Sequence, residues 1–241
     1  MRIGNNIVFN RILKNNAGEA VEKATYKGIA FKTLFFLLVT IVSAVGGLLL
    51  GSINPDAYIV MLVVAAFSTF ILSLISFLSV RACKVTGTLY CVAEGLLLGI
   101  VSYAVNFFLQ GAVSIALLAT ILVFGVVTVL YVTNIVKVNG KFMQFLSIFV
   151  ISFILFMIAL SIYSWIIGSF ENFGLSLLIS LVSIFLASLY LFFDLEKIRQ
   201  VVEGGYDKKL EWNAAFGLSF TLIWLYVEIL RLVLIVANRR N

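Results

Sequence analysis

Four charged residues lie in or beside long apolar segments, where hydropathy alone does not explain them. Glu94 lies in the middle of one apolar run, Asp194 closes another, and Glu228 and Arg231 lie inside the last. A charge at the centre of a bilayer costs ~3 kcal/mol or more. Such residues usually face the interior of a helix bundle and mark an ion pathway or a polar lock. These four are therefore the candidate functional residues.

Each of them also has a purely structural interpretation. Glu228 and Arg231 are three residues apart, so they share a helix face and could neutralise each other. Asp194 could be an ordinary interfacial acid at a helix end. Glu94 has no local partner, so it must find a base on another helix, stay protonated or line a wet cavity. The structural interpretation is therefore weakest for Glu94.

Three acids with one or two bases nearby have a definite chemistry. Like charges repel, so clustered carboxylates favour a state in which one of them holds a proton. Carboxylate oxygens are hard ligands that suit Ca²⁺ or protons better than soft metals. The sequence therefore predicts a pH-sensitive cation pathway, with Ca²⁺ or protons as the transported species. It predicts no catalytic residue, no resident cofactor and no fixed metal site.

The composition is that of a membrane protein. Of the 241 residues, 63% are apolar and only 12% are charged, about half the share usual in soluble domains. A soluble core of this size could not bury that much apolar surface, whereas a bilayer can. The absence of histidine excludes Ser–His dyads and HExxH zinc sites. Cys83 and Cys91 are too few for a disulfide framework or a metal cluster.

Seven apolar runs can be distinguished. Each reaches the roughly 20 residues that a helix needs to cross a ~30 Å hydrocarbon core. The predicted fold is an all-α integral membrane bundle of seven transmembrane helices, with an N-terminal segment over 1–28, a membrane domain over 29–237 and a tail over 238–241. The runs cover 33–53, 57–80, 85–105, 112–133, 142–168, 173–193 and 214–237.

Basic residues set the predicted orientation. Lysines and arginines gather in the N-terminal segment and in alternate connections between runs. This distribution is typical of the positive-inside rule and predicts a cytoplasmic N-terminus in a multi-pass protein of the plasma or inner membrane. With seven crossings the C-terminus would be external, which Arg239 and Arg240 contradict. Either the basic tail is tolerated outside, or the last run is re-entrant and ends inside. The net charge of +6 does not indicate nucleic acid, because the bases lie in short segments between apolar runs.

Small residues recur at helical spacing on two of the runs. Ser43, Gly47 and Gly51 stand four residues apart on the first run, as do Gly95 and Gly99 on the third. Small residues at this spacing let helix backbones approach closely. They predict packing seams rather than ligand sites.

The same acids carry a resemblance to a known family. The stretch 93–102, Ala-Glu-Gly-Leu-Leu-Leu-Gly-Ile-Val-Ser, resembles the third-helix signature of the Bax inhibitor-1-like (transmembrane Bax inhibitor motif) family. The stretch 188–194 resembles its sixth-helix aspartate motif, and 225–232 looks like its last helix. Residues 24–28 and 210–217 look like the bacterial YccA-like branch. The resemblance covers nearly the whole chain.

That resemblance implies a seven-helix fold with the last helix central, and a pH-sensitive Ca²⁺ leak. In the family, two acids on the sixth and seventh helices share a proton and hold the pore closed, and Asp194 and Glu228 occupy the matching positions. Two features depart from the family: the second acid is a glutamate, and the loop between the acids is longer. If the last helix starts near Trp212, Glu228 lies ~24 Å along it. Glu94 or Arg231 is then the alternative partner of Glu228.

Two other functions compete with a channel. A regulatory protein could bind and modulate a membrane protease or another stress-response protein, using the N-terminal segment and the 194–213 loop as docking surfaces. An intramembrane aspartyl protease needs two membrane aspartates, and only Asp194 lies in or beside a run. An enzyme is therefore not expected.

Overall fold

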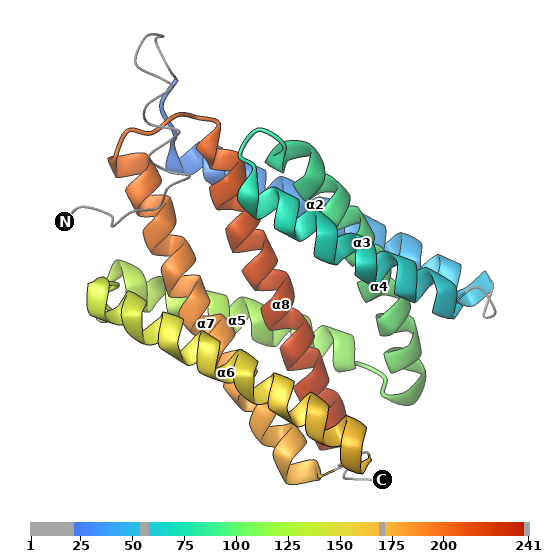
Figure 1. Ribbon diagram of the computed structural model, residues 1–241. Helices are drawn as coiled ribbons and strands as arrows, with labels where there is room; N and C mark the ends of the chain where they lie inside the picture. Colours follow the sequence, from blue (N-terminus) through green and yellow to red (C-terminus); the bar gives the residue numbers. More distant parts are fainter. Residues whose placement is uncertain (1–21, 54–57, 169–171, 239–241) are drawn as a thin grey trace.

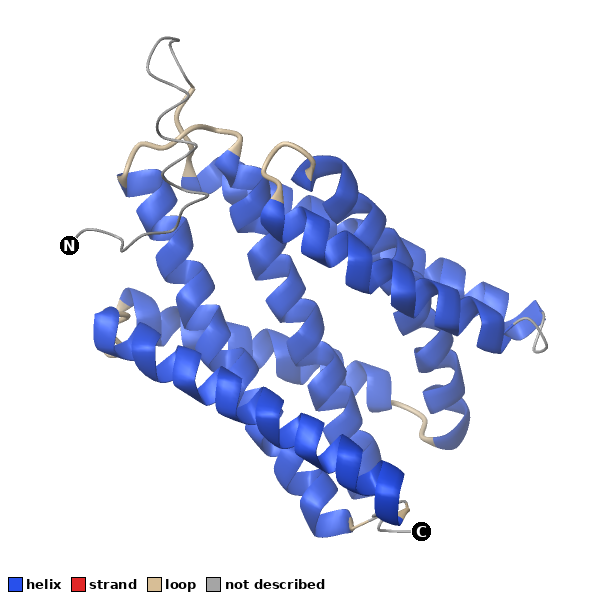
Figure 2. Ribbon diagram, viewed as in Figure 1, coloured by secondary structure: helices blue, strands red, loops and turns tan. Residues whose placement is uncertain are grey.

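The computed structural model describes residues 22–53, 58–168 and 172–238. These residues form helices without any strand, and the one β-bridge in the described part joins Lys23 to Asp207 (Figure 2). The all-α prediction is therefore confirmed. The helices are α2 (Tyr26–Ile53), α3 (Tyr58–Leu78), α4 (Cys83–Phe108), α5 (Ala112–Val132), α6 (Gly140–Ile167), α7 (Phe173–Glu203) and α8 (Leu210–Asn238).

The helices have the length and composition of membrane spans. Six of those described are long and apolar enough to cross a bilayer, and α3 contributes a shorter apolar stretch, Val63–Leu78. Large apolar side chains cover the outer faces of the helices, where a soluble protein would place polar ones. The chain is therefore a multi-pass membrane protein.

Helix α8 is the centre of the bundle. It packs against α2, α3, α4, α5 and α7 (Figure 1). Sixteen of its residues are buried, whereas Leu146 is the one buried residue among those described in α6. The main packing partner of α6 is α7. The expectation that the last helix is central is confirmed.

Aromatic residues hold α8 against the helices on one side. The ring of Phe216, which is fully buried, lies 5.8 Å from Phe36 on α2, 5.1 Å from Phe77 on α3 and 5.3 Å from Tyr90 on α4. These edge-on pairs add to the apolar contact that the rings make by burial. They join three helices to one point on α8.

Close backbone contact joins α2 to α4. A Cβ atom added to Gly95 would lie 2.7 Å from the Cβ of Ser43, and one added to Gly47 would lie 3.1 Å from the Cα of Gly99. At Gly99 a Cβ would collide with the carbonyl oxygen of Ala44. Small residues are therefore required where these two helices cross. The surroundings of Gly51 lie outside the described residues.

The predicted end of the sixth run was wrong. Helix α7 continues ten residues beyond position 193, to Glu203, because its polar residues are paired and its apolar residues still face the bundle. Glu196, for example, accepts hydrogen bonds from Arg199 and Gln200, each at 2.9 Å. Asp194 consequently lies nine residues, ~14 Å, inside the helix rather than at its end.

The predicted loop 194–213 was also wrong. Only residues 204–209 lie between α7 and α8. They contact the start of the described chain: the Ala24 amide donates to the Tyr206 carbonyl, and the Lys208 amide donates to the Glu22 carbonyl, both at 2.8 Å. The predicted docking surface on this segment is therefore shortened and occupied in part by the chain itself. The rest of the predicted N-terminal docking segment, 1–21, lies outside the described residues.

Candidate functional site

A large cavity lies inside the bundle beside α8. Its volume is about 1090 Å³, and α3, α4, α6, α7 and α8 all contribute to its walls. Most of the lining is apolar or aromatic. Glu94 from α4 and Asp194 and Lys197 from α7 bring ionisable groups to it. The structure thus brings together two of the acids that the sequence singled out.

Asp194 is the more deeply buried of these acids, with 5% of its surface exposed. Its Oδ2 accepts a hydrogen bond of 2.6 Å from the Thr221 hydroxyl on α8. A Cβ added to Gly217, one turn earlier on α8, would lie 3.2 Å from the other carboxylate oxygen. The small residue on α8 lets the carboxyl group approach the helix. Asp194 therefore links α7 directly to the central helix.

Lys197 extends this link toward one end of the bundle. It lies three residues after Asp194 on the same helix, and its charge attracts the Asp194 carboxylate. Its Nζ donates to Asn213 Oδ1 at 3.0 Å, and Asn213 Nδ2 donates to the backbone carbonyl of Ser76 at 3.1 Å. These contacts join α7, α8 and α3 at one edge of the cavity. The sequence analysis missed Lys197, although its spacing from Asp194 is a signal that could have identified it.

Glu94 faces the same cavity from α4. It is partly buried, and its carboxyl group lies beside the Thr69 side chain on α3. The described part of the chain places no lysine or arginine within ion-pair distance of it. Of the alternatives for Glu94, a base on another helix is therefore not the arrangement seen here. The side chain instead contributes a carboxyl group to the cavity wall.

Glu228 and Arg231 lie apart from this group. The Arg231 guanidinium is 3.9 Å from Glu228 Oε2 on the same helix, and nearly half of the arginine side chain is exposed. Glu228 lies seven residues, ~10 Å, beyond Thr221, the partner of Asp194. Asp194 and Glu228 therefore make their contacts at different levels of the bundle. Of the interpretations considered for Glu228, the structure shows the local ion pair with Arg231.

Comparison with known protein families gives a match over most of the sequence. The family described as Bax inhibitor 1 like matches residues 6–238, which is nearly the whole chain. The chain belongs to the Bax inhibitor 1-like family. A search of curated proteins found no match. Assignment of this Bax inhibitor 1-like chain to the bacterial YccA-like branch stays a prediction.

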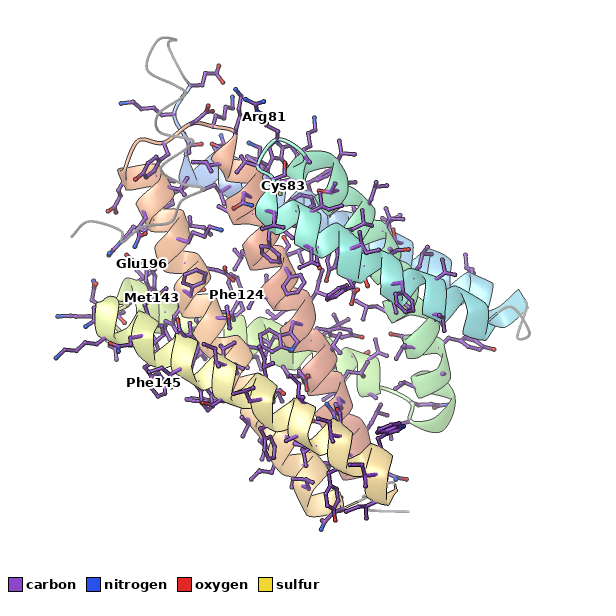
Figure 3. All side chains as sticks on the ribbon, viewed as in Figure 1. Arg81, Cys83, Phe124, Met143, Phe145 and Glu196 are labelled. Atoms are coloured by element: carbon purple, nitrogen blue, oxygen red, sulfur yellow. The ribbon has the colours of Figure 1, made fainter. Side chains whose placement is uncertain are left out.

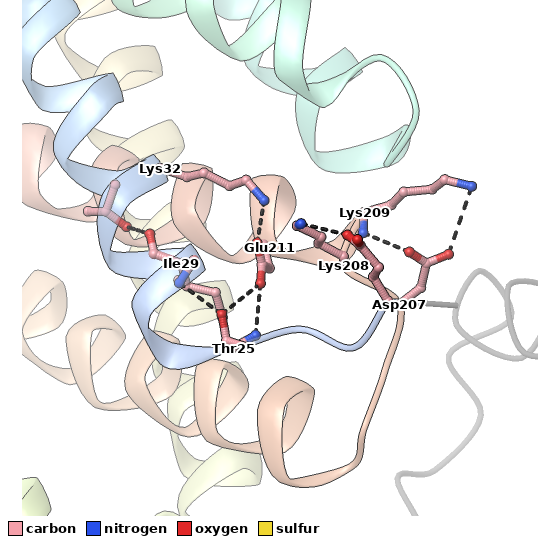
Figure 4. A network of polar contacts seen from close by, with 10 residues as sticks. Thr25, Ile29, Lys32, Asp207, Lys208, Lys209 and Glu211 are labelled. Carbon is pink, nitrogen blue, oxygen red and sulfur yellow. Dashed lines mark hydrogen bonds and ion pairs between the residues drawn. The ribbon is translucent and has the colours of Figure 1, made fainter. Parts of the chain in front are cut away.

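This Bax inhibitor 1-like protein also has a buried carboxylate on α8 itself, Glu211, which the sequence analysis did not single out. Glu211 is fully buried, forms an ion pair with Lys32 on α2 and accepts hydrogen bonds from Thr25 (Figure 4). The Thr25 amide lies 2.8 Å and its hydroxyl 3.2 Å from Glu211 Oε1. We call Thr25, Lys32 and Glu211 the Glu211 clamp. It fixes the start of α8 to the start of α2.

Basic residues surround the clamp. The Nζ atoms of Lys32 and Lys84 lie 5.1 and 5.4 Å from the ring centroid of Trp212. Arg81, in the turn before α4, lies at the same end of the bundle (Figure 3). Such cation–ring contacts stabilise partly exposed sites by about 0.5–1 kcal/mol. Sequence separation explains why the clamp was missed, because Lys32 and Glu211 are 179 positions apart.

Proposed function

We propose that this member of the family conducts cations through the cavity and that Asp194 is its proton-dependent gate, with Ca²⁺ as the transported ion. One observation carries the proposal: an internal cavity of a membrane bundle receives carboxyl groups from two helices, Glu94 from α4 and Asp194 from α7. Intramembrane carboxyl groups that face a cavity typically mark ion or proton pathways. Oxygen ligands of this kind suit Ca²⁺.

The contacts of Asp194 supply a gating mechanism. When it is ionised, the carboxylate accepts from Thr221 and attracts Lys197, which is bonded in turn to Asn213. In this state these contacts tie α7 to α8 beside the cavity and close it to cations. Protonation of Asp194 removes the attraction on Lys197 and loosens the link between α7 and α8. We therefore expect the flux to rise as the pH falls.

The test is Ca²⁺ flux into proteoliposomes that contain the full chain, measured on both sides of neutral pH. The wild type should show flux that increases on acidification. Asp194→Asn, which cannot ionise, should show raised flux with little dependence on pH. Glu203→Gln is the matched control, because Glu203 is an exposed acid at the end of the same helix. Flux equal to that of protein-free liposomes at every pH would sink the proposal.

A further inference from the structure

The cavity is bordered by two helices that face the bilayer. Its walls include Phe70 on α3 and Ile154 and Ile158 on α6, and each of these side chains is at least half exposed. In Figure 1, α3 and α6 lie on opposite sides of α8, and they are not among the helix pairs in substantial contact. Because both border helices belong to the membrane domain, what meets the cavity between them is lipid.

We propose that the hydrocarbon chain of a membrane lipid enters between α3 and α6 and occupies this cavity. An empty space of about 1090 Å³ would leave its lining atoms without dispersion contacts on one side. Water fills a cavity only where polar partners are available, and most of this lining is apolar. Acyl chains are the solvent at this depth, so they supply the missing contacts.

The polar groups of the cavity favour a hydrocarbon chain over a headgroup. The Asp194 carboxylate accepts a hydrogen bond from Thr221, and the Glu94 carboxyl group lies beside the Thr69 side chain. Lys197 is bonded to Asn213. Each ionisable group on this wall therefore has a polar protein neighbour, and most of the remaining lining is apolar.

The inference rests on the same cavity as the proposed function and adds a form of regulation to it. A hydrocarbon chain beside Asp194 excludes water and ions from the path. Conduction then requires the chain to leave, so lipid and cation exclude one another. Binding of the chain and conduction can nevertheless be measured separately.

Trp224 provides a direct probe, since it lines the cavity and packs against Tyr190 with the ring centroids 5.9 Å apart. The other tryptophans, Trp165 and Trp212, would be replaced by phenylalanine. The resulting protein is reconstituted in phosphatidylcholine whose acyl chains carry bromine at mid-chain, and in the unbrominated lipid. Bromine quenches tryptophan fluorescence at contact range, so we expect strong quenching of Trp224 in the brominated bilayer.

Two serines on α6 give a matched pair of variants. Ser161 lines the cavity and Ser147 does not, and each donates to the carbonyl four residues earlier at 2.9 Å. Ser161→Phe should lower the quenching of Trp224 about twofold, because the added ring takes the space of the chain and short-range contacts fall off steeply. Ser147→Phe should leave the quenching unchanged. Ser161→Ala, which adds no volume, should also leave it unchanged.

Three results would overturn the inference. If Ser161→Phe leaves the bromine quenching of the protein that retains Trp224 alone unchanged, Trp224 senses only the lipid around the protein. Quenching by iodide in water instead of bromine in lipid would mean a water-filled cavity. Protection from both quenchers, together with a dimer in light scattering, would mean that a second copy covers the opening. If bromine quenches Trp224 but the protein conducts no Ca²⁺, the proposed function fails and the inference about the lipid chain stands.

Discussion

Helix α8 has two sides that pack in different ways. Toward α2, α3 and α4 it meets a close aromatic cluster around Phe216, and α2 and α4 are joined at Gly47, Gly95 and Gly99. Toward α6 and α7 it borders the cavity, which α3 and α4 also line, and α6 is held mainly by α7. One side of α8 is thus closely packed, and the other side borders open space. Conformational change needs elements with few buried contacts, and α6 has the fewest buried residues.

Two buried carboxylates, Glu211 on α8 and Asp194 on α7, show a similar difference. Glu211 receives a lysine ammonium, an amide and a hydroxyl, so it is held from several directions. Asp194 receives one hydroxyl and the charge of Lys197, which has its own partner in Asn213. A fully satisfied carboxylate fixes a structure, whereas one with fewer partners can change its state with less loss. The difference in partners agrees with a structural role for Glu211 and with the switching role proposed for Asp194.

The largest expected effect comes from filling the seam on the closely packed side. In Gly99→Ala the new methyl group meets the Ala44 carbonyl oxygen, so the helices must separate. Overpacking of this kind costs about 3 kcal/mol or more when the obstacle is backbone. We expect a clearly lower melting temperature for Gly99→Ala than for the wild type in detergent, measured by thermal aggregation.

Gly125→Ala is the control for the seam. A Cβ at Gly125, on α5, would meet no atom within 4 Å. Replacing a helical glycine by alanine then stabilises by up to about 1 kcal/mol. Equal melting temperatures for the two variants would show that the α2–α4 contact is not tight, and the comparison between the two sides would fail.

The next effect tests the Glu211 clamp. Glu211→Gln keeps the shape of the side chain but leaves Lys32, of which 15% of the side chain is exposed, without its countercharge. Removing one member of a buried ion pair lowers the free energy of unfolding by about 3–5 kcal/mol. Because Lys32 is partly exposed, the expected decrease is about 2–3 kcal/mol. A chemical unfolding curve in detergent measures it.

A matched change at an exposed acid gives the control for the clamp. Glu203 is 63% exposed in its side chain and lies 3.9 Å from Arg199, so Glu203→Gln should cost less than about 1 kcal/mol. If Glu211→Gln were as stable as Glu203→Gln, the clamp would not fix α8 to α2. Flux should be little changed in either variant when the surviving folded protein is compared.

Hydropathy was enough to predict the number and order of the helices, because six of them are apolar along most of their length. It failed at the end of α7, where Glu196 and Arg199 are polar yet paired within the folded chain. A residue such as Glu196 lowers the hydropathy of a window whether or not it is neutralised. The helix end therefore lies beyond the point where the apolar run ends.

The candidate site was predictable only in part, because hydropathy does not show which charged residues find partners in the folded chain. Glu94 and Asp194 attracted attention as charges in or beside apolar runs, and both line the cavity. Lys197 and Glu211 lay outside the predicted runs and looked like ordinary surface residues. Their roles depend on partners such as Asn213 and Lys32, which only the tertiary fold brings close. Periodicity within one helix carries no information on such contacts.

A smaller effect on stability, but a direct one on flux, is expected at Lys197. Lys197→Met removes the charge at the edge of the cavity and leaves Asp194 without its attraction. The hydrogen bond from α7 to Asn213 on α8 is also lost, so the link that closes the cavity weakens and Ca²⁺ flux at neutral pH should rise toward that of Asp194→Asn. Lys209→Met removes an exposed lysine outside the helix bundle's cavity and should leave the flux unchanged. Reduced Ca²⁺ flux in Lys197→Met would contradict the proposal that Lys197 helps to close the cavity.

The smallest effect is expected at the ion pair between Glu22 and Lys208, whose atoms are 2.6 Å apart on the exposed end of the bundle. The hydrogen bond and charge of Lys208 lower the pKa of Glu22 below its ordinary value. A lowered pKa in the folded state means that the pair stabilises at neutral pH and that this contribution is lost as the pH falls through the folded-state pKa. Hydrogen exchange at the Lys208 amide, which donates to the Glu22 carbonyl, should therefore show more frequent opening in acid once the intrinsic exchange rate is divided out. Glu22→Gln should remove that pH dependence and leave Ca²⁺ flux unchanged. If Glu22→Gln abolished the acid activation of flux, the proton sensor would lie at this exposed end instead of at Asp194, and the contrast between the two sides of α8 would no longer explain gating.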